Sequence, residues 1–170
     1  MIRNLSSKPF LLLIIILLQS CISTKIASNK GTDYIKQPKK IFILMNNAKE
    51  TNEFCSFLLA KLKRKLLEKG VQSDSYRRNP LSLETEKDID SKINSYAPEA
   101  LMVIQQKIIH YTNGRVDGGT IEISLIDSET KKTVWKSEFE FYAMFRMTDA
   151  VDKSIKKIVN KLIEDKLIKA

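Results

Sequence analysis

The stretch "TIEISLIDSETKKTVWKSEFEF", residues 120–141, decides the fold because two runs in it alternate between apolar and polar side chains. Such alternation is typical of strands that bury one face. The residues between the runs, "SETKK", have the composition of a turn. The sequence therefore predicts an antiparallel hairpin. Its two apolar rows are Ile121, Ile123 and Leu125 on the first strand, and Trp135, Phe139 and Phe141 on the second.

Upstream of this hairpin, apolar runs of strand length alternate with helical stripes. The run "KIFILM" at 40–45 is typical of a buried strand, and Asn47 three residues before Glu50 matches a capping box for the next helix. Gly70 is the residue type preferred just after a helix C-terminus. The predicted elements are a strand at 40–45, a helix at 54–67, a strand at 71–76, a helix at 85–96 and a strand at 100–111.

The last element is a helix that we expect Thr148 and Asp149 to cap. The order β-α-β-α-β-β-β-α predicts a two-layer α/β (α+β) sandwich in one domain at 40–170, with a mixed sheet, a C-terminal antiparallel meander and three helices. The stripe of the last helix is Val151, Ile155, Ile158, Val159, Leu162 and Ile163. We expect one core to contain Trp135, Phe139, Ile121, Ile123, Leu58, Leu62, Ile155 and Leu162.

The N-terminal stretch "FLLLIIILLQSC", residues 10–21, contains nine consecutive apolar residues. A membrane-spanning helix needs about 20 apolar residues, so this run is too short to span a bilayer. Arg3 and Lys8 precede it and no acidic residue does. A basic segment, a short apolar segment and small residues at the exit are typical of a secretory signal peptide. We therefore expect residues 1–20 to be removed.

The sequence "LLQSC" that ends this run resembles the lipobox of bacterial lipoproteins. The resemblance implies cleavage between Ser20 and Cys21, and acylation of Cys21. Ile22 rather than an aspartate follows the cysteine, which by the same resemblance favours the outer membrane, facing the periplasm. Residues 21–39 are polar and are predicted to form a flexible tether. The alternatives are an ordinary signal peptide with a chance cysteine and a retained anchor helix.

The hairpin at 120–141 carries a second resemblance, to small α/β domains of envelope lipoproteins such as CsgG, LpoB and the N-terminal domain of TolB. Residues Asp127, Thr130, Lys132, Val134 and Trp135 match the pattern of that strand–turn–strand segment. The position of Lys131 is usually a glycine. The resemblance implies a periplasmic domain that assists a larger envelope machine.

The composition limits the possible partners. The net charge is +9, and it becomes +7 when Arg3 and Lys8 leave with the signal peptide. The lysines are interspersed with acidic residues, and an exported protein rarely meets nucleic acid, so no nucleic-acid partner is expected. Attraction to anionic lipid headgroups is one explanation for the excess positive charge. Cys21 and Cys55 are the only cysteines, so a lipidated Cys21 leaves no possible disulfide within the chain.

Residues that could support catalysis are few. His110 is the only histidine, which excludes a metal site with several histidines. No phosphate-binding or dinucleotide-binding glycine motif is present. A Cys55–His110 pair would require a helix residue to meet a strand residue. The acidic pairs Asp88 with Asp90, and Asp127 with Glu129, have no evident companion for acid–base work. We expect no metal, no cofactor and no enzymatic activity.

The function that the sequence favours is a lipid-anchored interaction module of the cell envelope. It would bind the membrane through its lipid and another envelope protein through its folded domain, and it could form a homo-oligomer. The predicted contact surface is the turn region "NGRVDGG", 113–119, with Asn113, Gly114, Arg115 and Asp117 as its residues. The alternatives are an envelope hydrolase with an unrecognised site and an oligomerising secretion component.

Overall fold

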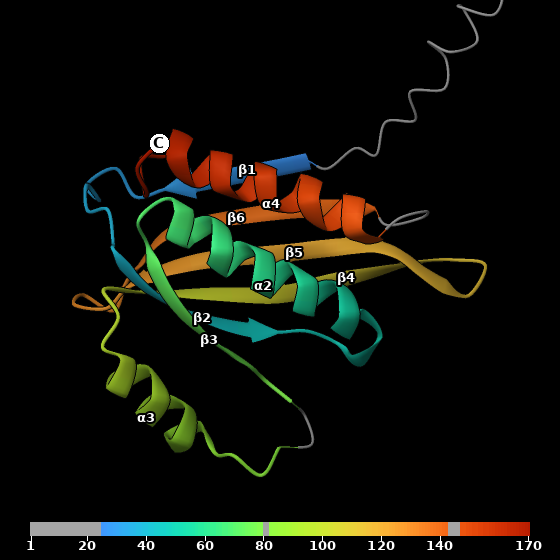
Figure 1. Ribbon diagram of the computed structural model, residues 1–170, viewed down its shortest axis with the longest axis horizontal. Helices are drawn as coiled ribbons and strands as arrows, with labels where there is room; N and C mark the ends of the chain where they lie inside the picture. The colour runs from blue at the N-terminus through green and yellow to red at the C-terminus, as the bar shows by residue number, and fades with distance from the viewer. Residues whose placement is uncertain (1–24, 80–81, 143–146) are drawn as a thin grey trace, which may run out of the picture.

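The computed structural model describes residues 25–79, 82–142 and 147–170, which form one six-stranded sheet covered by helices (Figure 1). The strand order is β1-β6-β5-β4-β2-β3. The strands are β1 (Lys25–Lys30), β2 (Lys40–Asn46), β3 (Gln72–Arg77), β4 (Ala100–Thr112), β5 (Arg115–Asp127) and β6 (Thr133–Tyr142), and the helices are η1 (Lys49–Thr51), α2 (Asn52–Glu68), α3 (Glu86–Tyr96) and α4 (Met147–Glu164).

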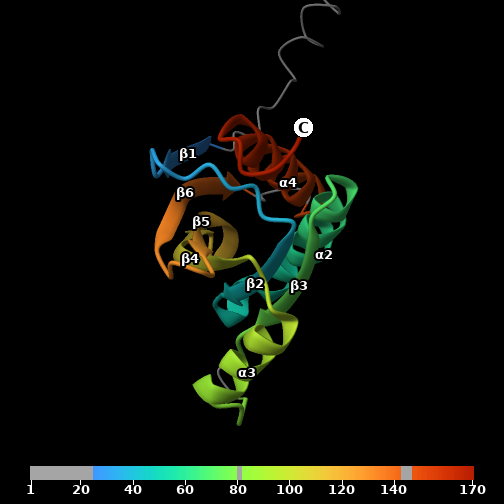
Figure 2. The ribbon, with the colours of Figure 1, turned by 90° about the vertical axis from the view of Figure 1, so that its left-hand side faces the viewer.

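Two layers make up the body of the domain, as the sequence predicts. Helices α2 and α4 lie side by side over one face of the sheet (Figure 2). Phe54 of α2 stacks on Phe141 of β6, with 3.9 Å between the ring centroids. All eight residues predicted for the core are buried in one cluster, which confirms that prediction: Leu58, Leu62, Ile121, Ile123, Trp135, Phe139, Ile155 and Leu162.

The sheet combines a parallel half and an antiparallel half. Strand β2 pairs in parallel with both β3 and β4, whereas β4, β5 and β6 form the predicted antiparallel meander. Helix α3 follows β3 and packs on the sheet face opposite α2, where the Tyr96 and Phe42 rings lie 5.7 Å apart. The two helices that follow β2 and β3 therefore leave toward opposite faces of the sheet.

Local signals set most helix and hairpin ends. Gly70 has φ +73° after α2, and Val71 donates its N–H to the Leu66 carbonyl, so Gly70 ends the helix as predicted. Thr85 caps α3 in a capping box with Asp88. The predicted cap at Asn47 is wrong, because its amide donates to Ala48 and Asn52 and α2 begins only after η1. Residues 148 and 149 lie inside the first turn of α4.

The segment predicted to be a tether is largely part of the fold, which corrects the boundary at residue 39. Residues 25–30 form the edge strand β1, which pairs with β6 along its whole length. The following residues are also held: Gly31 donates to the Val134 carbonyl, and Lys36 pairs with Asp127 at 3.0 Å. The sequence of β1 looks like a linker because an edge strand with one packed face needs few apolar side chains.

Asp165 directly follows α4, and its hydrogen bonds connect β1 and β6 to the end of that helix. Its carboxylate accepts hydrogen bonds from the Ser28 hydroxyl at 2.5 Å and from the Trp135 indole N–H at 2.7 Å. Lys161 lies 3.3 Å from the other carboxylate oxygen, and Lys30 donates to the Asp165 carbonyl at 2.8 Å. Burial raises the pKa of Asp165, but Ser28, Trp135 and Lys161 together outweigh it and hold the pKa below its ordinary value.

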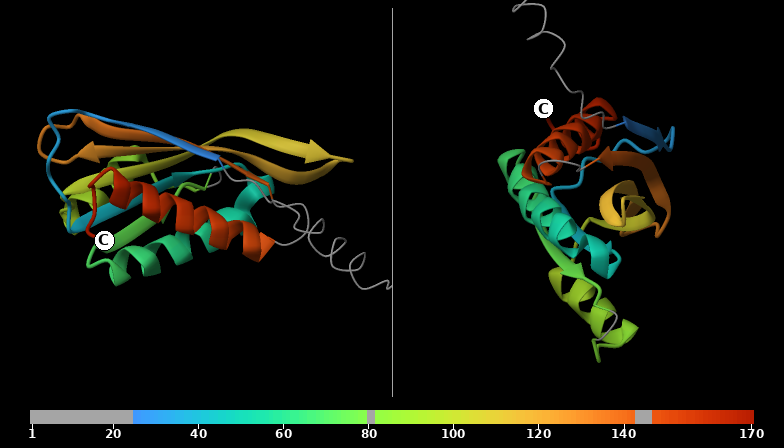
Figure 3. Two further views of the ribbon diagram at one scale, coloured as in Figure 1. Left: turned by 90° about the horizontal axis from the view of Figure 1, so that it is seen from above. Right: turned by 90° about the vertical axis from the view of Figure 1, so that its right-hand side faces the viewer.

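The hairpin of β4 and β5 extends past the ends of α2 and α4 (Figure 3, left). Asn113 and Gly114 both have positive φ, 51° and 72°, so they form the predicted turn. The predicted turn region at 113–119 is too long, because residues 115–119 belong to β5. Gly118 and Gly119 instead allow close strand approach: a Cβ on Gly119 would lie 2.5 Å from the Ile108 carbonyl oxygen.

Candidate functional site

The parallel half of the sheet creates a crevice where β2 and β3 end. These neighbouring strands continue into α2 and α3, which leave toward opposite faces. Diverging connections of this kind leave a crevice at the carboxyl ends of parallel strands, the usual position of ligand sites in open α/β sheets. A hollow of about 490 Å³ lies there. Its lining residues are Asn46, Asn47, Tyr76, Arg78, Asn79, Ser82, Glu84, Glu86 and Ile89.

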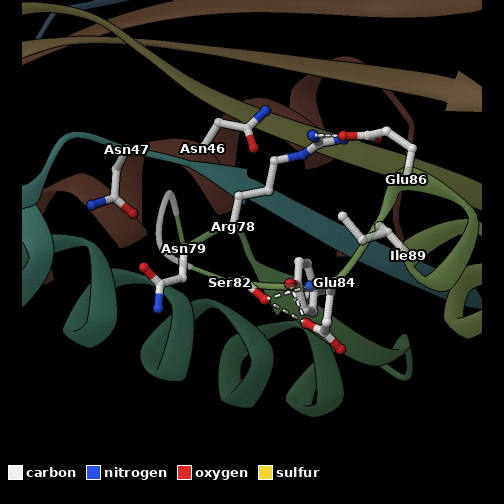
Figure 4. Close-up of a pocket in the computed structure, with 9 residues that line it drawn as sticks. Asn46, Asn47, Arg78, Asn79, Ser82, Glu84, Glu86 and Ile89 are labelled. Atoms are coloured by element: carbon white, nitrogen blue, oxygen red, sulfur yellow. Dashed lines mark hydrogen bonds and ion pairs between the residues drawn. The ribbon is translucent and has the colours of Figure 1, made fainter.

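Charged pairs cross the crevice. Arg78 and Glu86 point toward each other and form a bidentate ion pair (Figure 4). Glu84 accepts hydrogen bonds from Lys92 and from the Tyr76 hydroxyl. Arg78 lowers the pKa of Glu86, and Lys92 followed by Tyr76 lowers the pKa of Glu84. Both carboxylates are therefore ionised at neutral pH and can accept hydrogen bonds, but they cannot donate a proton.

Several polar atoms beneath the crevice are buried without a partner among the described residues. They are the side-chain oxygens of Asn46 and Asn47, and Nε of Arg78. Gln106, on the neighbouring β4, accepts hydrogen bonds from the Ala48 N–H at 3.1 Å and the Thr51 hydroxyl at 2.5 Å. An unpaired buried polar group costs about 1–3 kcal/mol. Any hydrogen-bonding group that reached these three atoms would therefore relieve that cost.

Sequence reasoning missed this crevice. The available signal was the occurrence of polar residues at the ends of two neighbouring parallel strands, Asn46-Asn47 at the end of β2 and Arg78-Asn79 after β3. Recognising it requires knowing that these two strands are neighbours. The sequence alone does not show that β2 pairs with β3.

The predicted contact surface is only partly exposed. Asn113, Gly114 and Arg115 are exposed at the tip of the β4–β5 hairpin. Asp117 is 8% exposed, and its carboxylate accepts a hydrogen bond from the Thr112 hydroxyl. A surface role for Asp117 is therefore wrong, because its side chain stabilises the hairpin from within. A partner contact at the other three residues stays a prediction.

The remaining candidates for chemistry have structural partners. Burial raises the pKa of the Cys55 thiol to about 11, and the sulfur lies 3.9 Å from the Thr51 hydroxyl. His110 lies against the ring of Tyr142. Lys36 bridges Asp127 and Glu129. Within residues 25–79, 82–142 and 147–170, the structure contains no cluster of at least three His, Cys, Asp or Glu side chains that could hold a metal ion.

The predicted signal peptide, its cleavage position at Ser20 and Cys21, and the acylated Cys21 itself lie outside the described residues. Among the helices that the structure describes, none has both the length and the apolar character to cross a membrane.

Comparison with known proteins relates the chain to others by fold alone. No family model matches it, and no curated protein matches it. Among solved structures, it is similar to a subunit of the PelC dodecamer from Paraburkholderia phytofirmans, with a TM-score of 0.54 at 11% identity, over 81% of this chain and 95% of that chain. A variant of the same dodecamer gives a TM-score of 0.55 at 13% identity, over 81% and 96% of the two chains. This chain therefore shares the fold of a protein that forms a dodecamer.

Proposed function

We propose that the mature chain is a lipid-anchored, non-catalytic accessory module of the bacterial cell envelope, held at the outer membrane through acylated Cys21 and facing the periplasm. In this role it binds another envelope protein and assists a larger assembly, secretion or transport machine. A tethered domain of this kind works at high effective concentration near its partner, so individually weak contacts are sufficient.

The sequence "LLQSC" at the end of the apolar N-terminal run is the observation that carries this proposal. The resemblance of residues 120–141 to envelope lipoprotein domains supports it. The fold shared with PelC is compatible with such a module.

The state of the polar side chains supports a binding role over catalysis. Both carboxylates in the crevice are held by hydrogen-bonded partners. Cys55 is buried with a raised pKa, which keeps it in the thiol form rather than the nucleophilic thiolate. Nothing in these contacts activates a nucleophile, whereas the crevice and the hairpin tip both offer hydrogen-bonding surface.

We infer also that the module assembles with copies of itself. Strands β1 and β3 are the two edges of the sheet, and each pairs with one neighbour in the part of the chain that the structure describes. A contact between different edges of successive copies is head-to-tail, and such contacts close into rings when the rotation allows it. The dodecamer of PelC, which shares this fold, supports self-association of the module.

The experiment that tests the anchor is the substitution Cys21→Ala. We expect the variant to remain an uncut, unacylated precursor, whereas the wild-type chain is processed and fractionates with the outer membrane. Mass spectrometry of the N-terminal peptide and membrane fractionation measure both properties. Normal processing and membrane partition of Cys21→Ala would contradict the lipid anchor, and recovery of wild type only in the inner membrane would contradict the assigned membrane.

Crosslinking in living cells followed by purification tests the accessory role. We expect a defined envelope protein to be captured by wild type and lost when Cys21→Ala removes the anchor. Turnover of an envelope substrate by the purified protein, abolished by substitutions of Glu84 or Glu86 in the crevice, would overturn the non-catalytic assignment.

A further inference from the structure

The direction of β1 shows which end of the domain the N-terminal segment leaves. Strand β1 runs antiparallel to β6, and the register places Lys25 opposite Glu140. Glu140 pairs with Thr120, and Thr120 pairs with Ile108. The chain that precedes Lys25 therefore leaves the sheet toward the end at which the β4–β5 hairpin turns.

The length of that preceding chain is short. Cys21 is four residues ahead of Lys25, and four residues span at most about 14 Å when fully extended. The hairpin turn at Asn113 lies five residues beyond Ile108 along β4, which corresponds to about 17 Å. The hairpin tip therefore extends at least as far from the body as Cys21 can reach.

The side chains of this hairpin suit the surface of a lipid bilayer. Ile108 and Tyr111 are 52% and 55% exposed, although both are large and apolar. Tyrosine is enriched where a membrane meets water, because its ring is apolar and its hydroxyl is polar. Arg115 adds a positive charge at the exposed tip of the same hairpin, and positive charge is attracted to anionic headgroups.

We propose that the β4–β5 hairpin contacts the headgroup layer of the membrane that holds the lipid on Cys21, with Ile108 and Tyr111 entering the interface. This inference rests on the proposed lipid anchor. It gives the domain a fixed orientation: the hairpin and the crevice between β2 and β3 face the membrane, and the β5–β6 turn faces away from it.

A protein partner at the hairpin is the competing occupant. It would depend mainly on the turn residues Asn113, Gly114 and Arg115, and it would not require a bilayer. The membrane contact depends mainly on Ile108 and Tyr111 and forms in vesicles that contain no other protein.

The test uses the full lipoprotein in vesicles of phosphatidylethanolamine and phosphatidylglycerol. An environment-sensitive fluorophore is attached at Tyr111→Cys, with Ile108→Cys as a second position and Ile35→Cys as the matched control. Ile35 is 87% exposed and lies beside Lys36, whose partner Asp127 ends β5 at the opposite end of the sheet. The native Cys55 reacts slowly because it is buried with a pKa raised to about 11.

We expect the emission of the labels at 111 and 108 to shift to shorter wavelength in vesicles and to be quenched by brominated lipids, while the label at 35 stays unchanged. Protein that sediments with the vesicles but carries water-exposed labels at all three positions would overturn the hairpin contact and leave the anchor intact. Shielding of the 111 label only when an envelope protein is added would also overturn it. Protein that does not sediment would overturn the anchor and the orientation together.

Discussion

At the scale of single residues, Asp165 joins three elements that are distant in sequence. Its carboxylate is only partly exposed and accepts hydrogen bonds from Ser28 of β1 and Trp135 of β6. A pattern search passes over this residue because it lies in a charged C-terminal segment. Its role depends on the tertiary fold, which brings β1 and β6 beside the end of α4, and the local sequence does not encode that proximity.

Replacing Asp165 should therefore loosen the edge of the sheet. Hydrogen bonds to a charged group contribute about 1.5–3 kcal/mol, so we expect Asp165→Ala to lower the free energy of unfolding by that amount. Glu164→Ala is the matched control, since Glu164 is an exposed neighbour whose carboxylate pairs with Lys161 at the surface, and it should change stability by less than about 0.5 kcal/mol. Urea denaturation measures both, and equal effects would contradict the role of Asp165.

Asp127 makes a pH-dependent contribution to stability. The backbone N–H of Thr130 donates to the Asp127 carboxylate and lowers its pKa to about 2, from the ordinary 3.8. Burial of the carboxylate opposes this shift, and Lys36 adds to it. Because the folded-state pKa is the lower one, the stabilisation is complete above pH 3.8 and is lost as the pH falls toward 2.

The variant Asp127→Asn cannot carry this charge. We expect wild type to be more stable than Asp127→Asn at pH 6, and the difference in urea midpoint to shrink steadily between pH 4 and pH 2. A difference that stays constant over this range would show that the Asp127 charge is not the cause.

At the scale of elements, the sequence locates those whose pattern is local. The meander of β4, β5 and β6 and the three α-helices appear within a few residues of their predicted positions, because alternation, helical stripes and Gly70 each act over a short segment. Strand β1 is missed because Ile26 is its one large apolar residue. The double-glycine segment at 118–119 is misassigned because the same residue type serves turns and crowded strands.

The stripe of α4 gives a prediction for packing. Ile155 is 3% exposed in the core, so Ile155→Ala should lower the free energy of unfolding by about 2–5 kcal/mol through lost burial and a residual cavity. Its neighbour Lys156 is exposed, and Lys156→Ala should change it by less than about 0.5 kcal/mol. Chemical denaturation compares the two, and an Ile155→Ala midpoint equal to that of wild type would contradict the packing.

At the scale of the whole molecule, the sequence predicts a two-layer α/β sandwich, but it does not predict which strands pair with β2. The order β4-β2-β3 sets the crevice and makes β3 one edge of the sheet, and the pairing of β1 with β6 makes β1 the other edge. These features depend on non-local pairing, so neither the candidate site nor the assembly surface could be derived from the sequence.

The free edges lead to a prediction about assembly. Because β1 and β3 belong to the folded body, we expect self-association in detergent with a mass several times that of the mature chain, and we expect it to persist in Cys21→Ala. Mass photometry over a range of concentrations measures this. A chain that stays monomeric at the highest concentration would exclude the edges as assembly surfaces.

The pairing of β1 with β6 also determines how the domain bears mechanical load. A pull on the chain ahead of Lys25, directed outward from that end of the sheet, acts along the strand axis. The inter-strand hydrogen bonds are perpendicular to that axis, so the six residue pairs from Lys25–Glu140 to Lys30–Trp135 resist sliding together instead of opening one after another. The bonds of Asp165 to Ser28 and Lys30 clamp the far end of the same strand. A pull on the N-terminal chain therefore loads β1 in shear. Because all six pairs must yield together, this arrangement resists more force than one in which the pairs open one after another.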